Sequence, residues 1–233
     1  MTDDRVIRIF IGYDSHETVA WHVLTHSILA RASRPVSFVP LNLKNLGPLM
    51  WRERNPLQST EFSFSRFLTP YLSGYEGWSL FMDCDMLVLE DIAKLWDLRD
   101  ERYAVMCVKH DHQPKEAVKF LDQPQTPYAK KNWSSVMLFN NPQCGALTPE
   151  YVNTASGLEL HQFKWLGDDG LIGGVPDNWN HLVGYQPRRD GVANVHYTLG
   201  GPYFEEFAGC EHGQTWFDER AALLGATQRT RGA

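Results

Sequence analysis

The sequence has few cysteines, and they form no pattern that binds zinc or builds a disulfide framework. Its four cysteines, Cys84, Cys107, Cys144 and Cys210, are spread over 233 residues without any CxxC spacing. This sparse usage predicts a reducing compartment and argues against a disulfide scaffold and a zinc ribbon. We therefore expect a cytoplasmic protein, a location compatible with peripheral attachment at the inner face of a membrane.

Long apolar runs and a basic amino-terminal leader are missing as well. No apolar run approaches the ~20 residues that a membrane-spanning helix needs. The opening residues, MTDDRVIRIF, carry acids where a signal peptide carries a basic stretch. The sequence thus predicts no transmembrane segment.

An excess of positive charge is also missing. The 22 basic and 28 acidic residues give a formal net charge of −6, the wrong sign for gripping a nucleic-acid backbone. Charged residues make up only 21% of the chain, whereas 43% is hydrophobic and 12% aromatic, which excludes intrinsic disorder. We expect one folded domain over residues 1–224, followed by a flexible tail over 225–233.

The first forty residues predict a strand, a helix and a second strand. Residues 6–11 are β-branched and apolar and stop at a Gly-Tyr-Asp loop. Apolar or small residues then recur at helical spacing from Ala20 to Ile28, and residues 36–41 form a second apolar run. This β-α-β order predicts an α/β fold with a parallel sheet.

Later segments continue the alternation. Residues 64–72 predict a one-faced helix that Pro70 kinks or shortens. A helix should begin at Thr148-Pro149 and end at Gly157, and a last helix should start near Trp216. The remaining predicted strands are 78–82, 86–89, 103–108, 136–139 and 192–198.

Asp83 and Asp85 are the first candidates for chemistry. They follow the apolar run Trp78–Met82 directly, and ligands of α/β sheets bind beyond the carboxyl ends of strands. Two carboxylates one residue apart can bind a hard divalent cation that holds a diphosphate. A DxD pair is short, however, and acids that cap or solvate a loop are the competing interpretation.

His196 is the second candidate, and it precedes a glycine-rich turn. An imidazole beside two carboxylates suits manganese, and the backbone N–H groups of Gly200 and Gly201 can cradle phosphate oxygens. A histidine taken alone is more often structural than a metal ligand.

Two further polar groups could contact a sugar. Asp168 and Asp169 lie between two glycines, where they are either ligands of a polyhydroxylated substrate or an ordinary turn. Ser134 and Ser135 enter the predicted strand 136–139, with a polar turn as the plainer interpretation.

The stretch from Leu80 to Val88, taken with Arg66 and the late His196, resembles GT-A glycosyltransferases. More narrowly, it is similar to the family of bacterial lipopolysaccharide galactosyltransferases and glycogenin. Members combine an acidic nucleotide loop after the first strand, a helix bearing an arginine, a strand ending in DxD and a late histidine before a glycine. The resemblance implies the GT-A fold, a Rossmann-like α/β fold with a central, mostly parallel sheet flanked by helices.

The resemblance also implies an activity and a set of site residues. It implies a metal-dependent hexosyltransferase that moves a sugar from a nucleotide-diphosphate sugar, favouring UDP, to a glycan, lipid or protein acceptor, with retention. Asp83, Asp85 and His196 would bind Mn²⁺ (or Mg²⁺). The implied nucleotide- and donor-binding residues are Tyr13, Asp14, Arg66, Asp83, Ser134, Ser135, Gly200 and Gly201, and the implied catalytic residues are Asp168 and Asp169. Acceptor contacts are expected in residues 111–131 and after Phe204.

Departures from the family pattern keep alternatives open. The family has a lysine after its late glycine, where this chain has residues 202–205, Pro-Tyr-Phe-Glu; Lys109 or Arg66 could replace it. A non-catalytic module that binds a nucleotide sugar or a glycan is therefore one alternative. Another is a haloacid-dehalogenase-type phosphatase that uses the DxD and Gly-Asp-Asp motifs, although Leu87 departs from its pattern.

Overall fold

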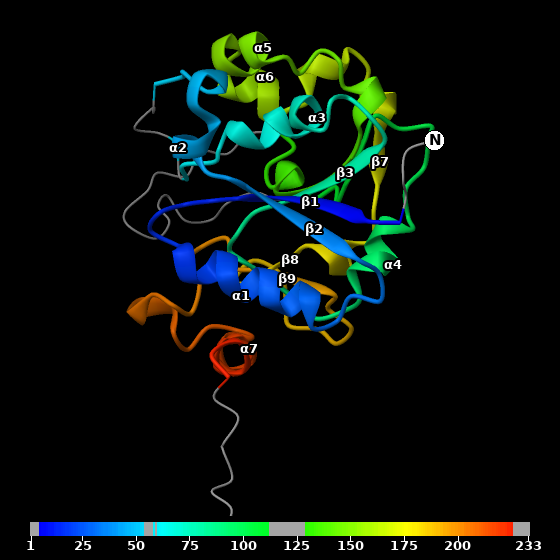
Figure 1. Cartoon of the computed structure of the whole chain (residues 1–233). Helices are drawn as coiled ribbons and strands as arrows, with labels where there is room; N and C mark the ends of the chain where they lie inside the picture. Colours follow the sequence, from blue (N-terminus) through cyan, green and yellow to red (C-terminus); the bar gives the residue numbers. More distant parts are fainter. Residues whose placement is uncertain (1–4, 54–57, 59, 112–128, 226–233) are drawn as a thin grey trace, which may run out of the picture.

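A computed structural model describes residues 5–53, 58, 60–111 and 129–225 (Figure 1). Its helices are α1 (Thr18–Leu29), α2 (Leu43–Leu46), α3 (Thr69–Leu72), α4 (Ile92–Trp96), α5 (Pro149–Thr154), α6 (Gly157–His161) and α7 (Gly213–Leu223). Its strands are β1 (Ile7–Gly12), β2 (Val36–Leu41), β3 (Trp78–Met82), β4 (Met86–Val88), β5 (Val105–Cys107), β6 (Val136–Asn140), β7 (Ile172–Gly174), β8 (His181–Leu182) and β9 (Asn194–His196).

The strands form one large and one small sheet. The large sheet has the order β2-β1-β3-β6-β5-β7, and the small sheet has the order β4-β9-β8. In the large sheet β6 runs antiparallel to both of its neighbours, while the other strands share one direction. This arrangement confirms the predicted α/β fold with a mostly parallel sheet.

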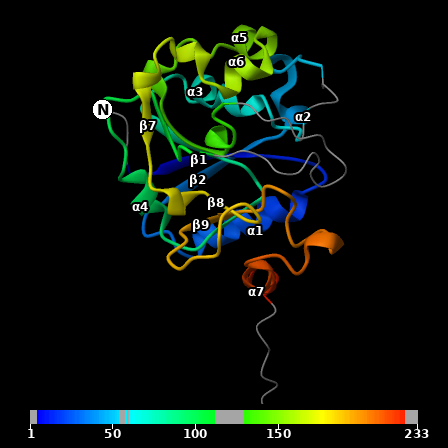
Figure 2. The ribbon, with the colours of Figure 1, turned by 180° about the vertical axis from the view of Figure 1, so that it is seen from behind.

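Helices cover the large sheet on two sides. Figures 1 and 2 show α3, α5 and α6 on one side of it, with α1 and the small sheet on the other. Strands β3 and β6 are buried along their whole length, as the apolar runs at 78–82 and 136–139 predict for central strands. The carboxyl end of β3 therefore delivers Asp83 and Asp85 into the interior between the two sheets.

Close packing at the end of β1 requires a glycine. A Cβ atom on Gly12 would lie 2.3 Å from a ring carbon of Phe62, far inside van der Waals contact. The small residue lets the aromatic ring cross the strand end, and this holds the segment that leads to Arg66 against the sheet.

Three predicted elements differ in detail from the structure. Residues 64–72 form a 3₁₀ turn, Ser65–Leu68, followed by the short α3, because Pro70 can enter only the first turn of a helix. Gly157 does not end α5; it opens α6, whose capping box joins Ser156 and Glu159. The last helix begins at Gly213, before Trp216.

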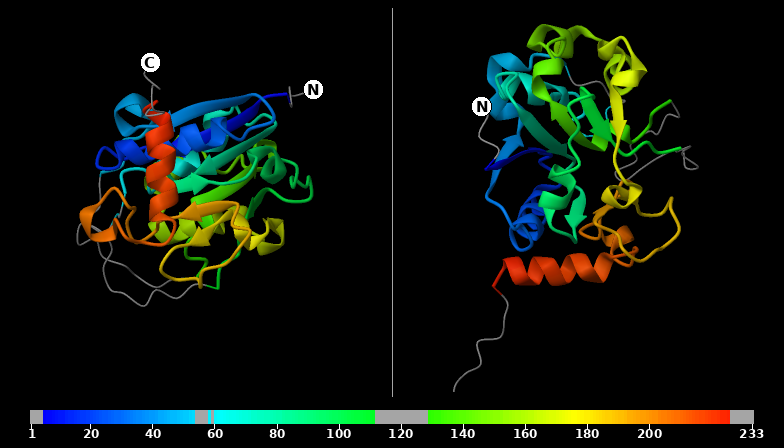
Figure 3. Two further views of the ribbon diagram at one scale, coloured as in Figure 1. Left: turned by 90° about the horizontal axis from the view of Figure 1, so that it is seen from below. Right: turned by 90° about the vertical axis from the view of Figure 1, so that its right-hand side faces the viewer.

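The carboxyl-terminal helix α7 packs across α1 (Figure 3). Glu219 of α7 lies 2.5 Å from His26 Nδ1 and 2.7 Å from Arg31 Nη2, both at the carboxyl-terminal end of α1 or just after it. Trp216 is fully buried in a small core with Val195 of β9. The last helix is therefore anchored to both α1 and the small sheet.

Within the described residues, no helix combines the length and the apolar character that crossing a bilayer requires. All four cysteines are free thiols.

Candidate active site

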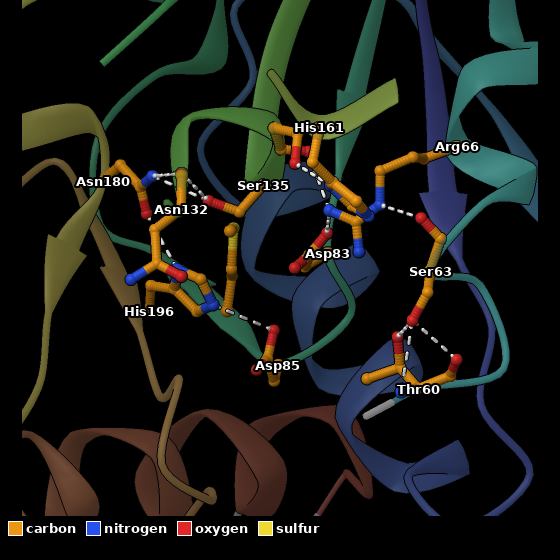
Figure 4. Close-up of polar contacts among 12 residues, drawn as sticks. Thr60, Ser63, Arg66, Asp83, Asp85, Asn132, Ser135, His161, Asn180 and His196 are labelled. Carbon is orange, nitrogen blue, oxygen red and sulfur yellow. Dashed lines mark hydrogen bonds and ion pairs between the residues drawn. The ribbon is translucent and has the colours of Figure 1, made fainter. Parts of the chain in front are cut away.

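Asp83, Asp85 and His196 meet between the two sheets (Figure 4). Each offers a ligand atom within 4.8 Å of the others, and the three residues are only 8%, 7% and 2% exposed. His196 Nε2 lies 3.4 Å from Asp85 Oδ1. The register explains the meeting, because Met86, next to Asp85, pairs with His196 across β4 and β9.

The donor set fits a divalent cation. Two carboxylates and an imidazole form the mixed oxygen and nitrogen set that suits manganese, and carboxylates alone suit magnesium. Two acids buried side by side are also unfavourable unless a cation neutralises them. The structure thus brings together the three residues that were predicted from the sequence as metal ligands, although Asp83 and His196 lie 113 positions apart in the chain.

Asn180 fixes the ring of His196. Its Oδ1 accepts a hydrogen bond from His196 Nδ1 at 2.9 Å, and its Nδ2 donates to Ser135 Oγ at 2.8 Å. Ser135 Oγ in turn donates to the Asn132 carbonyl at 2.7 Å. Because Nδ1 carries the proton in this arrangement, the lone pair of Nε2 faces Asp85 and is available to a metal. Ser135 therefore helps to orient His196 through its hydrogen bond with Asn180.

Replacing Asn180 with alanine is expected to weaken Mn²⁺ binding about 10- to 100-fold, because His196 loses the acceptor that holds its tautomer and ring orientation. The Asn180→Asp variant keeps an acceptor oxygen and should retain more affinity than Asn180→Ala. Titration calorimetry with Mn²⁺ measures both variants. Equal affinities for Asn180→Ala and the wild-type protein would contradict this role.

Arg66 is the cation that the structure pairs with Asp83. Its Nη1 lies 2.8 Å from Asp83 Oδ1 and donates to the Ser134 carbonyl at 2.8 Å, while Nε donates to the Ser63 carbonyl. The guanidinium also lies 5.3 Å from the ring centroid of Phe62. Arg66 is 6% exposed, so its charge acts at short range in a weakly screened interior.

His161 and Lys131 lie beside this cation and were not nominated from the sequence. Ser134 Oγ lies 2.8 Å from His161 Nδ1. Burial, followed by the positive charges of Arg66 and Lys131, lowers the pKa of His161 well below its usual value. The imidazole is therefore neutral at pH 7 and can hold the Ser134 hydroxyl in place.

Glu17 is a buried carboxyl group that belongs to no motif recognised in the sequence. It is 1% exposed at the start of α1, and one carboxylate oxygen accepts a hydrogen bond from Tyr203. Burial, followed by the nearby charge of Asp85, raises the pKa of Glu17 well above its usual value. A neutral Glu17 adds no further negative charge to the cluster of acids.

This raised pKa makes the stability of the metal-free protein depend on pH. The folded chain keeps a proton on Glu17 that the unfolded chain releases above the ordinary value of 4.5, so the free energy of unfolding falls as pH rises toward the folded pKa. Glu17→Gln cannot ionise and should show a smaller fall. Urea unfolding with a chelator at several pH values tests this, with the exposed Glu206→Gln as the matched control. Parallel pH profiles for Glu17→Gln and the wild-type protein would refute it.

Tyr13 and Asp14 lie in the loop after β1, close to the start of α1. Asp14 is buried and accepts hydrogen bonds from the backbone N–H groups of His16 and Glu61, each at 2.9 Å. The Tyr13 hydroxyl lies 3.1 Å from Thr18 Oγ1. Asp14 thus ties the loop to the segment before Arg66, and the ring of Tyr13 is half-buried.

Asp168 and Asp169 lie on the surface before β7. Asp168 accepts a hydrogen bond from Gly170 N at 2.8 Å, and Asp169 lies 2.5 Å from Lys130 Nζ. Neither belongs to the group formed by Asp83, Asp85 and His196. A local turn and an ion pair account for both carboxylates in this structure.

The glycine turn after β9 packs tightly. Gly200 adopts φ 146°, and a Cβ atom on Gly201 would lie 2.2 Å from the ring of Tyr203.

Lys109 donates to the Ile172 carbonyl at 2.7 Å. Residues 112–128 of the expected acceptor region lie outside the described residues.

Known structures share this fold. The bifunctional glycosyltransferase WbbM matches with a TM-score of 0.66 and 15% identity, over 95% of this chain and 50% of its own. Galactosyltransferase LgtC, solved with donor and acceptor sugar analogues, has a TM-score of 0.61 and 13% identity over 97% of this chain and 98% of its own. GlyE of Streptococcus pneumoniae TIGR4 also has a TM-score of 0.61, with 14% identity over 94% of this chain and 62% of its own.

These likenesses confirm the GT-A glycosyltransferase fold that the sequence resemblance implied. The chain spans half the length of WbbM. No protein-family model matches the sequence. Protein CDI of Arabidopsis thaliana is 48% identical over 228 residues, which cover 94% of this chain and 87% of that protein. The chain therefore belongs to the same family as protein CDI.

Proposed function

We propose that this protein is a metal-dependent glycosyltransferase. It takes a hexose from a nucleotide-diphosphate sugar, with UDP as the favoured nucleotide, and transfers it with retention to a glycan, lipid or protein acceptor. One observation carries the proposal: Asp83, Asp85 and His196 converge at the carboxyl end of β3 in a GT-A fold.

Asp83, Asp85 and His196 hold Mn²⁺ or Mg²⁺ in this proposal. The bound cation supplies Lewis-acid stabilisation of the negative charge that the departing nucleotide diphosphate gains. Asn180 keeps His196 in the tautomer that can bind the metal.

Other residues position the donor. Arg66 offers a buried cation beside Asp83, which supports a role near the diphosphate or the sugar. Tyr13 and Asp14 line the nucleotide loop, and the backbone N–H groups of the Gly200–Gly201 turn suit phosphate oxygens. Two pairs complete the proposed donor site, Ser134 with Ser135 and Asp168 with Asp169.

The role of Asp168 and Asp169 requires that one of their carboxylates reach the donor sugar. As sugar transfer proceeds, the donor sugar becomes oxocarbenium-like, and a carboxylate stabilises that charge only at close range. Both side chains are exposed, and Asp169 would first have to leave Lys130. Neither belongs to the group of Asp83, Asp85 and His196, which disfavours the phosphatase alternative, because that enzyme needs both acidic motifs in one metal site.

The test is a panel of UDP- and GDP-sugars, scored for Mn²⁺-dependent release of the nucleotide. We expect release from a UDP-sugar in the presence of Mn²⁺ and none with a chelator. UDP with Mn²⁺ should also raise the melting temperature, since a ligand at 100 times its Kd adds about 2.7 kcal/mol of stability. Release of inorganic phosphate from sugar phosphates would favour the phosphatase. UDP binding without turnover of any donor would favour a binding module.

A further inference from the structure

A second cluster of metal-binding side chains lies on the small sheet, apart from Asp83 and Asp85. His181 of β8 meets Glu211 and His212, which directly precede α7, and their ligand atoms all lie within 4.8 Å of one another. His181 pairs in register with Val195, the residue before His196. Neighbouring residues of a strand point to opposite faces, so the two histidines serve different sides of the sheet.

Two of the three distances between the ligand atoms match those of a tetrahedral zinc site. Glu211 Oε1 lies 3.3 Å from His181 Nε2 and 3.4 Å from His212 Nε2. Ligands at about 2.0–2.2 Å from a tetrahedral zinc ion are separated by about 3.3–3.6 Å. One carboxylate oxygen therefore already lies at the required distance from both imidazole nitrogens.

The cluster also leaves buried polar atoms without hydrogen bonds. His181 is fully buried, and neither of its ring nitrogens has a hydrogen-bond partner in the described part of the chain. Glu211 Oε1 and His212 Nε2 lack one as well. Buried polar groups are nearly always satisfied, and here the unsatisfied atoms of three residues face one another.

We propose that His181, Glu211 and His212 bind a divalent transition-metal ion of the zinc class. Two imidazoles and one carboxylate form a set of protein ligands that zinc accepts, with a fourth position for water. The Glu211 and His212 side chains are 16% and 15% exposed, so the cluster lies near the surface of the protein.

Local structure holds His212 in place. Its backbone adopts φ 57°, a left-handed conformation that histidine enters more readily than most residues. The hydroxyl of Tyr197, which lies just after β9, donates to the His212 carbonyl at 3.0 Å. The ion would link β8 to the start of α7 and so hold the segment after Gly201 against the small sheet.

The test uses the Asp85→Asn variant, in which the other metal site lacks a ligand. Equilibrium dialysis against Zn²⁺ should find one ion per chain, and Co²⁺ should give the intense visible absorption of a low-coordinate site. Adding Glu211→Gln or His212→Gln should weaken Zn²⁺ binding at least 10-fold and abolish the rise in melting temperature that Zn²⁺ causes. Both side chains reach the surface, so these variants avoid the fully buried His181.

The matched control is His22→Gln, which removes an exposed histidine of α1 and should leave the stoichiometry and the affinity unchanged. Absence of bound Zn²⁺ from the Asp85→Asn protein would overturn the proposal. Unchanged Zn²⁺ affinity in both the Glu211→Gln and the His212→Gln variants would overturn it equally. Neither result bears on sugar transfer, which depends on the other cluster.

Discussion

Replacing Asp85 with asparagine is expected to lower Mn²⁺-dependent sugar transfer by about 100-fold or more. Asp85 is one of three proposed ligands, and its carboxylate lies 3.4 Å from His196 Nε2. Asparagine keeps the shape of the side chain but removes the charge that attracts the cation, so both metal affinity and stabilisation of the leaving diphosphate fall. Nucleotide release from the preferred donor, followed against Mn²⁺ concentration, measures the effect.

Asp97→Asn is the matched control for this prediction. Asp97 carries the same carboxylate on the surface, where it pairs with Arg34 at 2.7 Å, and its loss should leave the rate unchanged. A metal dependence in Asp85→Asn that equals the wild-type dependence would remove Asp85 from the site. Because asparagine is nearly isosteric with aspartate, circular dichroism should confirm that the variant stays folded.

Strands and the amphipathic first helix could be predicted because local pattern decides them. The apolar runs at 6–11, 36–41 and 78–82 became β1, β2 and β3 with nearly the same bounds. The predicted end of α5 at Gly157 was wrong, because a glycine can end a helix or begin one. Here the capping box of Ser156 and Glu159 makes Gly157 the first residue of α6. The antiparallel direction of β6 depends on pairing between distant segments, which no local pattern records.

The candidate site was predictable to the same extent. The two acids after β3 follow a general rule for α/β sheets, and the family resemblance added His196. No sequence motif marks Asn180 or Glu17 as part of the site. Asn180 acts through its hydrogen bond with His196, and Glu17 is hydrogen-bonded by Tyr203, each partner being distant in the sequence. Such supporting contacts emerge only from the folded arrangement.

Replacing Arg66 with methionine is expected to cost the metal-free protein about 3–5 kcal/mol of unfolding free energy. Methionine keeps much of the apolar stem but removes the guanidinium that pairs with Asp83 at 2.8 Å. The Asp83 carboxylate, only 8% exposed, would remain buried near Glu17 and Asp85 without its cation. Urea unfolding in the presence of a chelator measures the loss.

The double variant Arg66→Met/Asp83→Asn separates charge from packing. With asparagine at position 83, removing Arg66 leaves no buried carboxylate without a cation. The double variant should therefore be more stable than Arg66→Met alone. Mn²⁺ should restore part of the stability of Arg66→Met, since a cation bound by Asp83 compensates the same charge. Arg34→Met, which breaks the exposed pair with Asp97, should cost only about 0–1 kcal/mol. If Arg66→Met lowers the free energy of unfolding no more than Arg34→Met does, solvent rather than Arg66 stabilises the Asp83 carboxylate. The Asp83 carboxylate would then be too well solvated for a neighbouring cation, whether Arg66 or a metal ion, to stabilise it strongly.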